Sequence, residues 1–343
     1  MRSATYEGLG NPDGTPKPKL LRAIEQLANG EVGLIVPGYV YPMESGKAAH
    51  YQCALYLDKH AQSWKSTIEY VHKTGSKIVF QICHGGMNVV QGLEPISPTT
   101  IRNRSREVTI SEVEDIIEAF RRSAVLAHKA GADGVQIHAA HGYLFSAFLS
   151  PLYNKRSDQY GGSPEKQARV INEIADTIKS TLGKDFPIYI KMNGSDFLPF
   201  GTNPDLASKY VNILKKNIDM FEISCGYQVT NATIRPNKLS FKDRFLFGIK
   251  NEEGYNLKYA QYIKKKNPNT IIASVGGFNH SSFMENALEM GMADIISMSR
   301  PFIREPNLVT TLQLRKAEQS ACIRCNDCLH TVISRNQLAC TYP

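Results

Sequence analysis

The chain has 343 residues, of which 42% are hydrophobic and 21% charged, a balance typical of one large globular domain or two modest ones. No stretch approaches the roughly eighteen consecutive apolar residues of a membrane-spanning helix, and residues 1–7 lack the apolar core of a signal peptide. The net charge of +8 would suit a nucleic-acid-binding protein, but the basic residues are spread thinly, with 264–266 as the densest run. We therefore expect a cytoplasmic protein without a nucleic-acid or membrane partner.

Short apolar runs alternate with helical patterns along the chain. The clearest helix is predicted over 111–130, where Ser111 and Glu114 have the spacing of a capping box. A second helix is expected over 256–266, before Pro268. Strands are predicted from near-continuous apolar runs, which are typical of parallel strands buried on both faces. In chain order these runs are 33–36, 77–82, 134–138, 188–192, 220–224, 271–275 and 295–298.

This alternation predicts an α/β fold, either an open doubly wound sheet or an eight-stranded barrel. No Gly-x-Gly-x-x-Gly sequence follows the first strand, which weakens the dinucleotide-binding fold. Polar residues instead follow many different strands, the arrangement of a (β/α)8 barrel. We predict a single barrel domain over residues 1–343, ending in a Cys-rich extension at 319–343. The eighth strand would have to come from the first few residues.

The last two strand ends have the features of an anion site. Gly276 and Gly277 follow the strand predicted at 271–275, and Ser299 and Arg300 follow the next one. Glycine leaves backbone N–H groups accessible, and a guanidinium binds phosphate through paired hydrogen bonds. Barrels commonly bind phosphate in these loops. An ordinary turn is the alternative for the glycine pair alone.

Three other strand ends carry candidate catalytic or cofactor-binding residues. His138, His141 and Tyr143 place two imidazoles and a phenol where they can hold a carbonyl or anionic oxygen and deliver a proton. Gln81 can both donate and accept hydrogen bonds. Lys191 is expected to face the barrel mouth, where it needs an anionic partner. A zinc site at the two histidines is a weaker option, because the sequence has no third ligand nearby.

Four cysteines lie within nineteen residues near the end of the chain. In a protein without an export signal, such clustering indicates a metal or redox site rather than disulfides. The spacing suits a four-thiolate site for an iron–sulfur cluster or zinc, and unligated thiols are the alternative. The candidate ligands are Cys322, Cys325, Cys328 and Cys340.

The block at 135–144, with the segments 148–151 and 154–162 that follow, resembles the Old Yellow Enzyme family of FMN-dependent oxidoreductases. The resemblance covers nearly the whole chain. It implies a (β/α)8 barrel that binds FMN, with NADH or NADPH as the reductant.

The resemblance also implies individual roles. His138 and His141 would bind the carbonyl or nitro oxygen of an acceptor, and Tyr143 would donate a proton to its α-carbon. Gln81 and Lys191 match the glutamine and the basic residue that contact the isoalloxazine ring, although many relatives have arginine at the second position.

The Cys-rich extension is similar to the motif of trimethylamine dehydrogenase and 2,4-dienoyl-CoA reductase. In those enzymes a four-iron four-sulfur cluster lies next to the FMN barrel. The likeness implies a possible cluster of this type here.

The start of the chain departs from the family. Residues 1–5 resemble the loop that follows the first strand, so this strand is expected to be missing or truncated. A barrel without one strand would have two unpaired edges.

The leading interpretation is an FMN-dependent NAD(P)H oxidoreductase that reduces activated alkenes, quinones or similar small-molecule acceptors. The alternatives are an iron–sulfur flavoprotein of the dienoyl-CoA reductase or amine dehydrogenase type, and a truncated barrel with little activity. An RNA-modifying FMN barrel would also suit the basic charge, but no RNA-binding module is recognisable. The sequence leaves the oligomeric state open.

Overall fold

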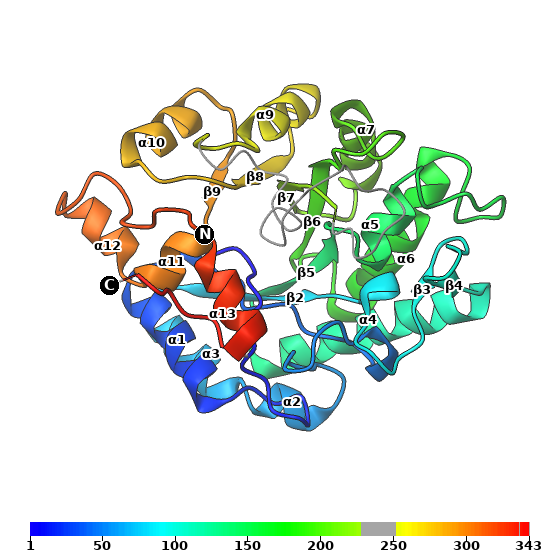
Figure 1. The fold of residues 1–343 in the computed structure, drawn as a ribbon, viewed down its shortest axis with the longest axis horizontal. Helices are drawn as coiled ribbons and strands as arrows, with labels where there is room; N and C mark the ends of the chain where they lie inside the picture. Colours follow the sequence, from blue (N-terminus) through cyan, green and yellow to red (C-terminus); the bar gives the residue numbers. More distant parts are fainter. Residues whose placement is uncertain (228–251, 336, 343) are drawn as a thin grey trace.

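The computed structural model describes residues 1–227, 252–335 and 337–342. Within these residues, seven parallel strands form one curved sheet in the order β1-β2-β5-β6-β7-β8-β9, with helices packed around its outside (Figure 1). The strands are β1 (Leu34–Ile35), β2 (Lys77–Ile82), β5 (Gly134–Ala139), β6 (Ile188–Ser195), β7 (Met220–Cys225), β8 (Ile271–Val275) and β9 (Ile295–Ser297). A separate two-stranded sheet pairs β3 (Ile96–Ser97) with β4 (Arg106–Glu107).

Helices connect successive strands, as in a barrel. They are α1 (Pro18–Asn29), α2 (Asp58–Gln62), α3 (Lys65–Lys73), α4 (Ile110–Ala130), α5 (Leu144–Leu149), α6 (Pro164–Leu182), α7 (Pro204–Leu214), α9 (Leu257–Lys266), α10 (Ser281–Glu289), α11 (Arg300–Arg304), α12 (Leu308–Gln313) and α13 (Asp327–Arg335). Short 3-10 turns lie at Glu44–Gly46 and Gly86–Asn88. Among the helices of the described residues, none combines the length and the apolar character needed to span a membrane.

Residues 1–3 occupy the place of the first barrel strand. Arg2 forms parallel bridges to Ile35 on one side and to Met298 on the other. Its carbonyl accepts a hydrogen bond from the Val36 N–H at 3.0 Å, and the Ser3 N–H donates to the Met298 carbonyl at 2.9 Å. In the described residues this position is occupied by isolated bridges rather than a full strand, which agrees with the sequence prediction. The expectation of two unpaired edges was wrong, because three residues supply ladder hydrogen bonds to both neighbouring strands.

The apolar runs of the sequence coincide with the strands to within one residue at most ends, and β6 continues three residues further than predicted. The predicted start of the long helix was wrong. Thr109, not Ser111, is the N-cap of α4: its hydroxyl accepts from the Glu112 N–H, and the Glu112 carboxylate accepts from the Thr109 N–H. Both pairs have the capping-box spacing, but only Thr109 has the extended backbone that a cap requires.

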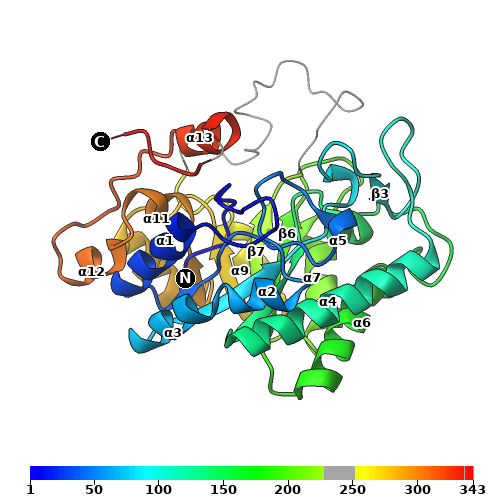
Figure 2. The same cartoon turned by 90° about the horizontal axis from the view of Figure 1, so that it is seen from below.

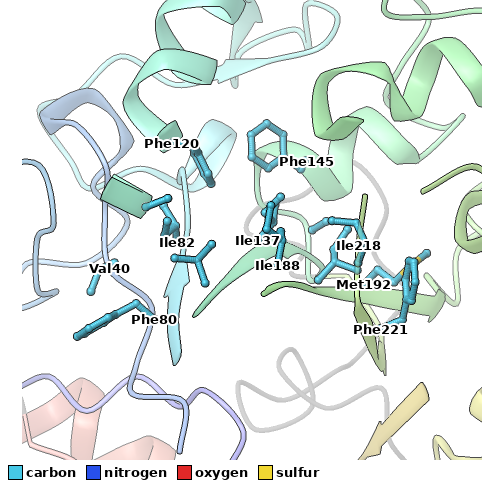
Figure 3. Close-up of a cluster of buried hydrophobic side chains, with 14 of the residues drawn as sticks. Val40, Phe80, Ile82, Phe120, Ile137, Phe145, Ile188, Met192, Ile218 and Phe221 are labelled. Carbon is cyan, nitrogen blue, oxygen red and sulfur yellow. The ribbon is translucent and has the colours of Figure 1, made fainter. Parts of the chain in front are cut away.

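The core lies between the strands and the inner faces of the helices. Figure 3 shows apolar side chains of β2, β5, β6 and β7 in this layer, close to α4 and α5. Phe120 of α4 meets Phe145 of α5 edge to face, with ring centroids 5.0 Å apart. Burial of each such side chain stabilises the fold by about 1.5–3 kcal/mol. This packing holds the strand ends, and the polar residues that follow them, in fixed positions.

The Cys-rich segment lies at one face of the barrel. Figure 2 shows α13 on the same side as α11 and the N-terminal residues, away from α4 and α6. Two side chains of α13, Leu329 and Val332, reach the cavity described below.

Candidate functional site

The strand ends and the loops after them surround a cavity of about 480 Å³. Small-molecule sites commonly have this size and lie at the carboxyl-terminal face of barrels. The cavity brings together most of the residues singled out in the sequence. These are Gln81, His138, His141, Tyr143, Lys191, Gly276 and Ser299.

Lys191 of β6 forms a buried ion pair with Glu222 of β7, to which it is paired in strand register. Their side chains are 6% and 0% exposed, and the Lys191 Nζ lies 3.5 Å from the Glu222 Oε1. The carboxylate also accepts hydrogen bonds from Ser3, Ser297 and Gln136, at 2.6, 2.9 and 3.0 Å. A buried lysine needs an anion. From the sequence we expected a bound ligand to be this anion. In the structure the anion is the Glu222 carboxylate of the chain itself.

Gln81 joins the same network from the other side. Its Nε2 donates to the Gln136 Oε1 at 2.7 Å, and the Gln136 Nε2 donates in turn to Glu222. Gln81 and Gln136 are also partners in strand register. These contacts fix the Gln81 amide at the cavity wall.

His138, His141 and Tyr143 form one cluster after β5. The His138 ring centroid lies 5.4 Å from that of His141 and 5.0 Å from that of Tyr143. The His141 Nε2 lies 2.7 Å from the Ser224 Oγ, and its backbone has a left-handed φ of 64°, which turns the chain sharply at the cavity. The His138 Nδ1 is buried without a partner among the described atoms. The cluster therefore has a donor or acceptor in place for a ligand.

Burial controls the protonation of this cluster. It lowers the pKa of His141 to about 3, with a further effect from the positive charge of Lys191. It also lowers the pKa of His138 well below its usual value, helped by His141 and Lys191. Burial raises the pKa of Tyr143 above its usual value. At neutral pH the imidazoles are uncharged and the phenol keeps its proton, so both imidazoles and the phenol can donate hydrogen bonds.

Tyr39 is a member of the cluster that the sequence analysis missed. Its hydroxyl lies 3.1 Å from the Tyr143 hydroxyl, and its ring is nearly parallel to that of His138 at 6.1 Å. Tyr39 follows the short β1, so the rule that polar residues after barrel strands face the mouth could have found it. The same rule applies to Ser224 and to Tyr227, which also lines the cavity.

A smaller cavity of about 60 Å³ adjoins the main one and shares Gly276 and Ser299 with it. The predicted anion-site residues Gly277 and Arg300 line it. A side chain at position 276 would bring its Cβ within 2.7 Å of the Tyr255 ring, at a φ of 132° that L residues rarely adopt. The backbone at position 276 is accessible because only glycine fits there.

The four clustered cysteines are free thiols that line one cavity of about 20 Å³. Burial raises the pKa of the Cys328 thiol to about 11, against the opposing effect of the Arg300 charge. Among the described residues, no group of three or more His, Cys, Asp or Glu side chains is arranged to hold a metal ion. Metal binding by these thiols therefore stays a prediction.

The donor set of the main cavity fits a flavin. The Gln81 amide can bond to the edge of an isoalloxazine ring, and Lys191 can lie near the atoms that gain negative charge on reduction. The unpartnered His138 Nδ1 and the buried, unpartnered Asn256 Oδ1 offer further polar contacts. The phosphate would lie at the small cavity with Arg300.

Comparison with known proteins identifies the family. Residues 4–319 match the model of the NADH:flavin oxidoreductase / NADH oxidase family. The chain belongs to this family of FMN-dependent oxidoreductases. Among curated relatives, it is 31% identical to a NADH oxidase of Thermoanaerobacter brockii, over 97% of this chain and 52% of that protein. It is 30% identical to a NADPH dehydrogenase of Clostridium acetobutylicum, over 82% of this chain and 80% of that protein.

Two solved structures have the same fold. A 2-naphthoyl-CoA reductase in complex with 2-naphthoyl-CoA matches 98% of this chain and 53% of its own, with a TM-score of 0.85 and 25% identity. The Old Yellow Enzyme homologue of Zymomonas mobilis matches 94% of this chain and 90% of its own, with a TM-score of 0.76 and 22% identity. The family member described here thus spans about half the length of the NADH oxidase and of the naphthoyl-CoA reductase.

Proposed function

We propose that the chain is an FMN-dependent NAD(P)H oxidoreductase that reduces activated alkenes, quinones or similar small molecules. The observation that carries the proposal is the cluster of His138, His141 and Tyr143 in one cavity with Lys191, which is paired with Glu222. Family membership supports flavin chemistry. The relatives differ in their named reductant, NADH in one and NADPH in the other, so the choice stays open. A cytoplasmic location is proposed on the sequence alone.

FMN, when bound, supplies a hydride acceptor and donor. The two neutral imidazoles hold the carbonyl or nitro oxygen of the acceptor and withdraw electron density from its double bond. Tyr143 keeps its proton at neutral pH and donates it to the α-carbon. Lys191 provides a positive charge at the cavity wall, and Gln81 orients the ring through its amide. The apolar side chains of Leu329 and Val332 on α13 also border the cavity.

The first experiment is anaerobic purification with a visible absorption spectrum and an assay of released flavin. Near-stoichiometric FMN, reduced on addition of NADH or NADPH and reoxidised by 2-cyclohexenone, is the expected result. A folded protein that binds no flavin when FMN is added would contradict the proposal.

The role of Tyr143 is tested separately with Tyr143→Phe. Stopped-flow measurements should give an unchanged rate of flavin reduction by NADPH and a rate of 2-cyclohexenone reduction that falls at least tenfold. The exposed Tyr70 provides a matched control, since Tyr70→Phe removes a hydroxyl far from the cavity. Equal loss in both half-reactions would argue that Tyr143 maintains the site rather than donates the proton.

We propose as a second function that the Cys-rich segment holds a four-iron four-sulfur cluster that exchanges electrons with the flavin. The four thiols share one small cavity, and the segment also borders the flavin cavity through α13, so the two centres would be neighbours. Cys322, Cys325, Cys328 and Cys340 would be the ligands.

Iron and acid-labile sulfide assays on the anaerobic protein decide between the cluster, zinc and free thiols. About four irons and four sulfides per chain, lost in Cys340→Ser but kept in a control with Cys53→Ser, are expected. Cys53 is buried elsewhere in the fold. Zinc in place of iron, or a metal-free anaerobic sample in which all seven cysteines titrate as thiols after denaturation, would refute the cluster.

A further inference from the structure

The small cavity beside Gly276 is lined by two arginines from different parts of the chain. Arg300 begins α11 after the last strand, and Arg324 lies in the loop between Cys322 and Cys325. Among the described residues that line this cavity, none is an aspartate or a glutamate. Two arginines that line one small space without a lining carboxylate favour a ligand with more than one negative charge.

Arg324 is held at this cavity by specific contacts. Its Nη1 donates to the Gly277 carbonyl at 3.2 Å and to the Glu252 carbonyl at 3.5 Å. Gly277 belongs to the loop after β8, which the sequence predicts as part of the anion site. The backbone of Arg324 has a left-handed φ of 58°, which costs an L residue about 1–2 kcal/mol. Backbone strain of this kind is a reason to look for a function of the residue, and Arg324 lines the cavity.

The segment that carries Arg324 is joined to the same site at two further points. The Arg300 Nη1 donates to the Asn326 Oδ1, so the two arginines are linked through the Cys-rich loop. Leu329 and Val332 lie about one and two helical turns after Asn326, and both line the main cavity. The segment from Arg324 to Val332 thus borders the site, and is not an appendage to the barrel.

We propose that Arg324 is, with Arg300, the second cation that binds the phosphate of FMN. This inference rests on the proposed FMN function and extends it. The Cys-rich segment then has two tasks: its thiols form the candidate metal site, and its arginine retains the flavin through the phosphate. Because Arg324 lies between Cys322 and Cys325, any change that unfolds this loop removes the cation from the phosphate site.

The proposal predicts a difference between FMN and riboflavin, which share the ring system but differ in the phosphate. The experiment measures the affinity of both flavins for the full-length, flavin-free protein by fluorescence quenching. Wild type should prefer FMN. Arg324→Gln should lower the FMN affinity at least tenfold, as expected for the loss of a hydrogen bond between charged groups, and leave the riboflavin affinity within about twofold. Arg335→Gln, on the exposed side of α13, should change neither.

The other outcomes separate the possible failures. An equal loss of both flavins in Arg324→Gln would show that the arginine only supports the loop, and overturn the proposal. Equal wild-type affinities for FMN and riboflavin would also overturn it, with the flavin function intact. A wild type that binds neither flavin would refute the proposed function itself. If Arg324→Gln does not fold, Arg324→Lys decides, because lysine keeps the charge but loses the paired geometry. A reduced preference for FMN supports the proposal, and an unchanged preference contradicts it.

Discussion

Glu222 is the residue whose replacement should affect the stability of the barrel most directly. Its side chain is fully buried, it balances the charge of Lys191, and it accepts three further hydrogen bonds. Glu222→Gln keeps the shape but removes the charge, which leaves a buried lysine without its anionic partner. Breaking a buried ion pair in this way costs about 3–5 kcal/mol. The new amide N–H2 would also face the Gln136 donor, which costs about 1–3 kcal/mol if no group reorients.

The assay is urea unfolding followed by the fluorescence of Trp64, the single tryptophan of the chain, which is buried against Phe80. Glu222→Gln should lower the free energy of unfolding of the flavin-free protein by at least about 3 kcal/mol. The exposed Glu285 gives a matched control, and Glu285→Gln should stay within about 0.5 kcal/mol of wild type.

A double variant tests the cause. When Lys191→Met is added to Glu222→Gln, both charges are gone, and the double variant should be more stable than Glu222→Gln alone, because the unpaired charge has been removed. A Glu222→Gln protein as stable as wild type, or a double variant less stable than the single one, would refute the reasoning.

Three further predictions concern the cavity and its surroundings. Tyr39→Phe removes the hydroxyl that contacts Tyr143, so 2-cyclohexenone reduction should slow about fivefold, the effect of one hydrogen bond, while stopped-flow reduction by NADPH stays unchanged. Gly276→Ala places a methyl group 2.7 Å from the Tyr255 ring, so FMN affinity measured by equilibrium dialysis should fall at least tenfold. Lowering the pH from 6.5 towards 4 should destabilise the protein in urea unfolding, because burial lowers the pKa of His84 to about 4 and only the unfolded state takes up the proton in this range. The loss is up to about 1.4 kcal/mol per pH unit for this residue.

Each prediction has a control or a contradicting result. Gly92→Ala shares a positive φ, at 97°, but its Cβ would meet nothing within 4 Å, so an equal loss of FMN in both alanine variants would contradict the steric argument. His84→Gln should reduce the slope of the free energy of unfolding against pH by the contribution of one proton. An unchanged slope would exclude His84 as the source of the dependence. A Tyr39→Phe variant slowed in both half-reactions would show that the hydroxyl holds the cavity together.

Much of the fold could be predicted, because parallel strands that are buried on both faces appear in the sequence as near-continuous apolar runs. The apolar runs at 77–82 and 271–275 match β2 and β8 residue for residue. The cap of α4 was misplaced because two overlapping capping-box spacings compete, and only the backbone conformation at Thr109 decides between them. The sequence placed the eighth strand in the first few residues, but it also predicted unpaired edges, because a segment this short has no periodicity that would indicate pairing on both sides.

The candidate site was predictable where one strand end carries several polar residues, as at His138 and His141. Residues that reach the site from elsewhere were missed. Glu222 lies inside an apolar run, and its partner Lys191 is 31 residues away, so only the strand register brings them together. Arg324 lies between Cys322 and Cys325, and the sequence pattern there indicates a role only for the thiols. Neither contact has a local sequence signal.

The hydrogen bonds that link Glu222, Gln136 and Gln81 have a fixed direction. A carboxylate can only accept, so Gln136 must point its nitrogen towards Glu222 and its oxygen towards Gln81. Gln81 must then offer its own nitrogen to Gln136. An isolated amide could lie either way round, with nearly the same shape. Here the Glu222 carboxylate, two side chains away, sets the orientation of the Gln81 amide at the cavity wall. It thereby decides whether the donor or the acceptor of that amide is turned away from Gln136.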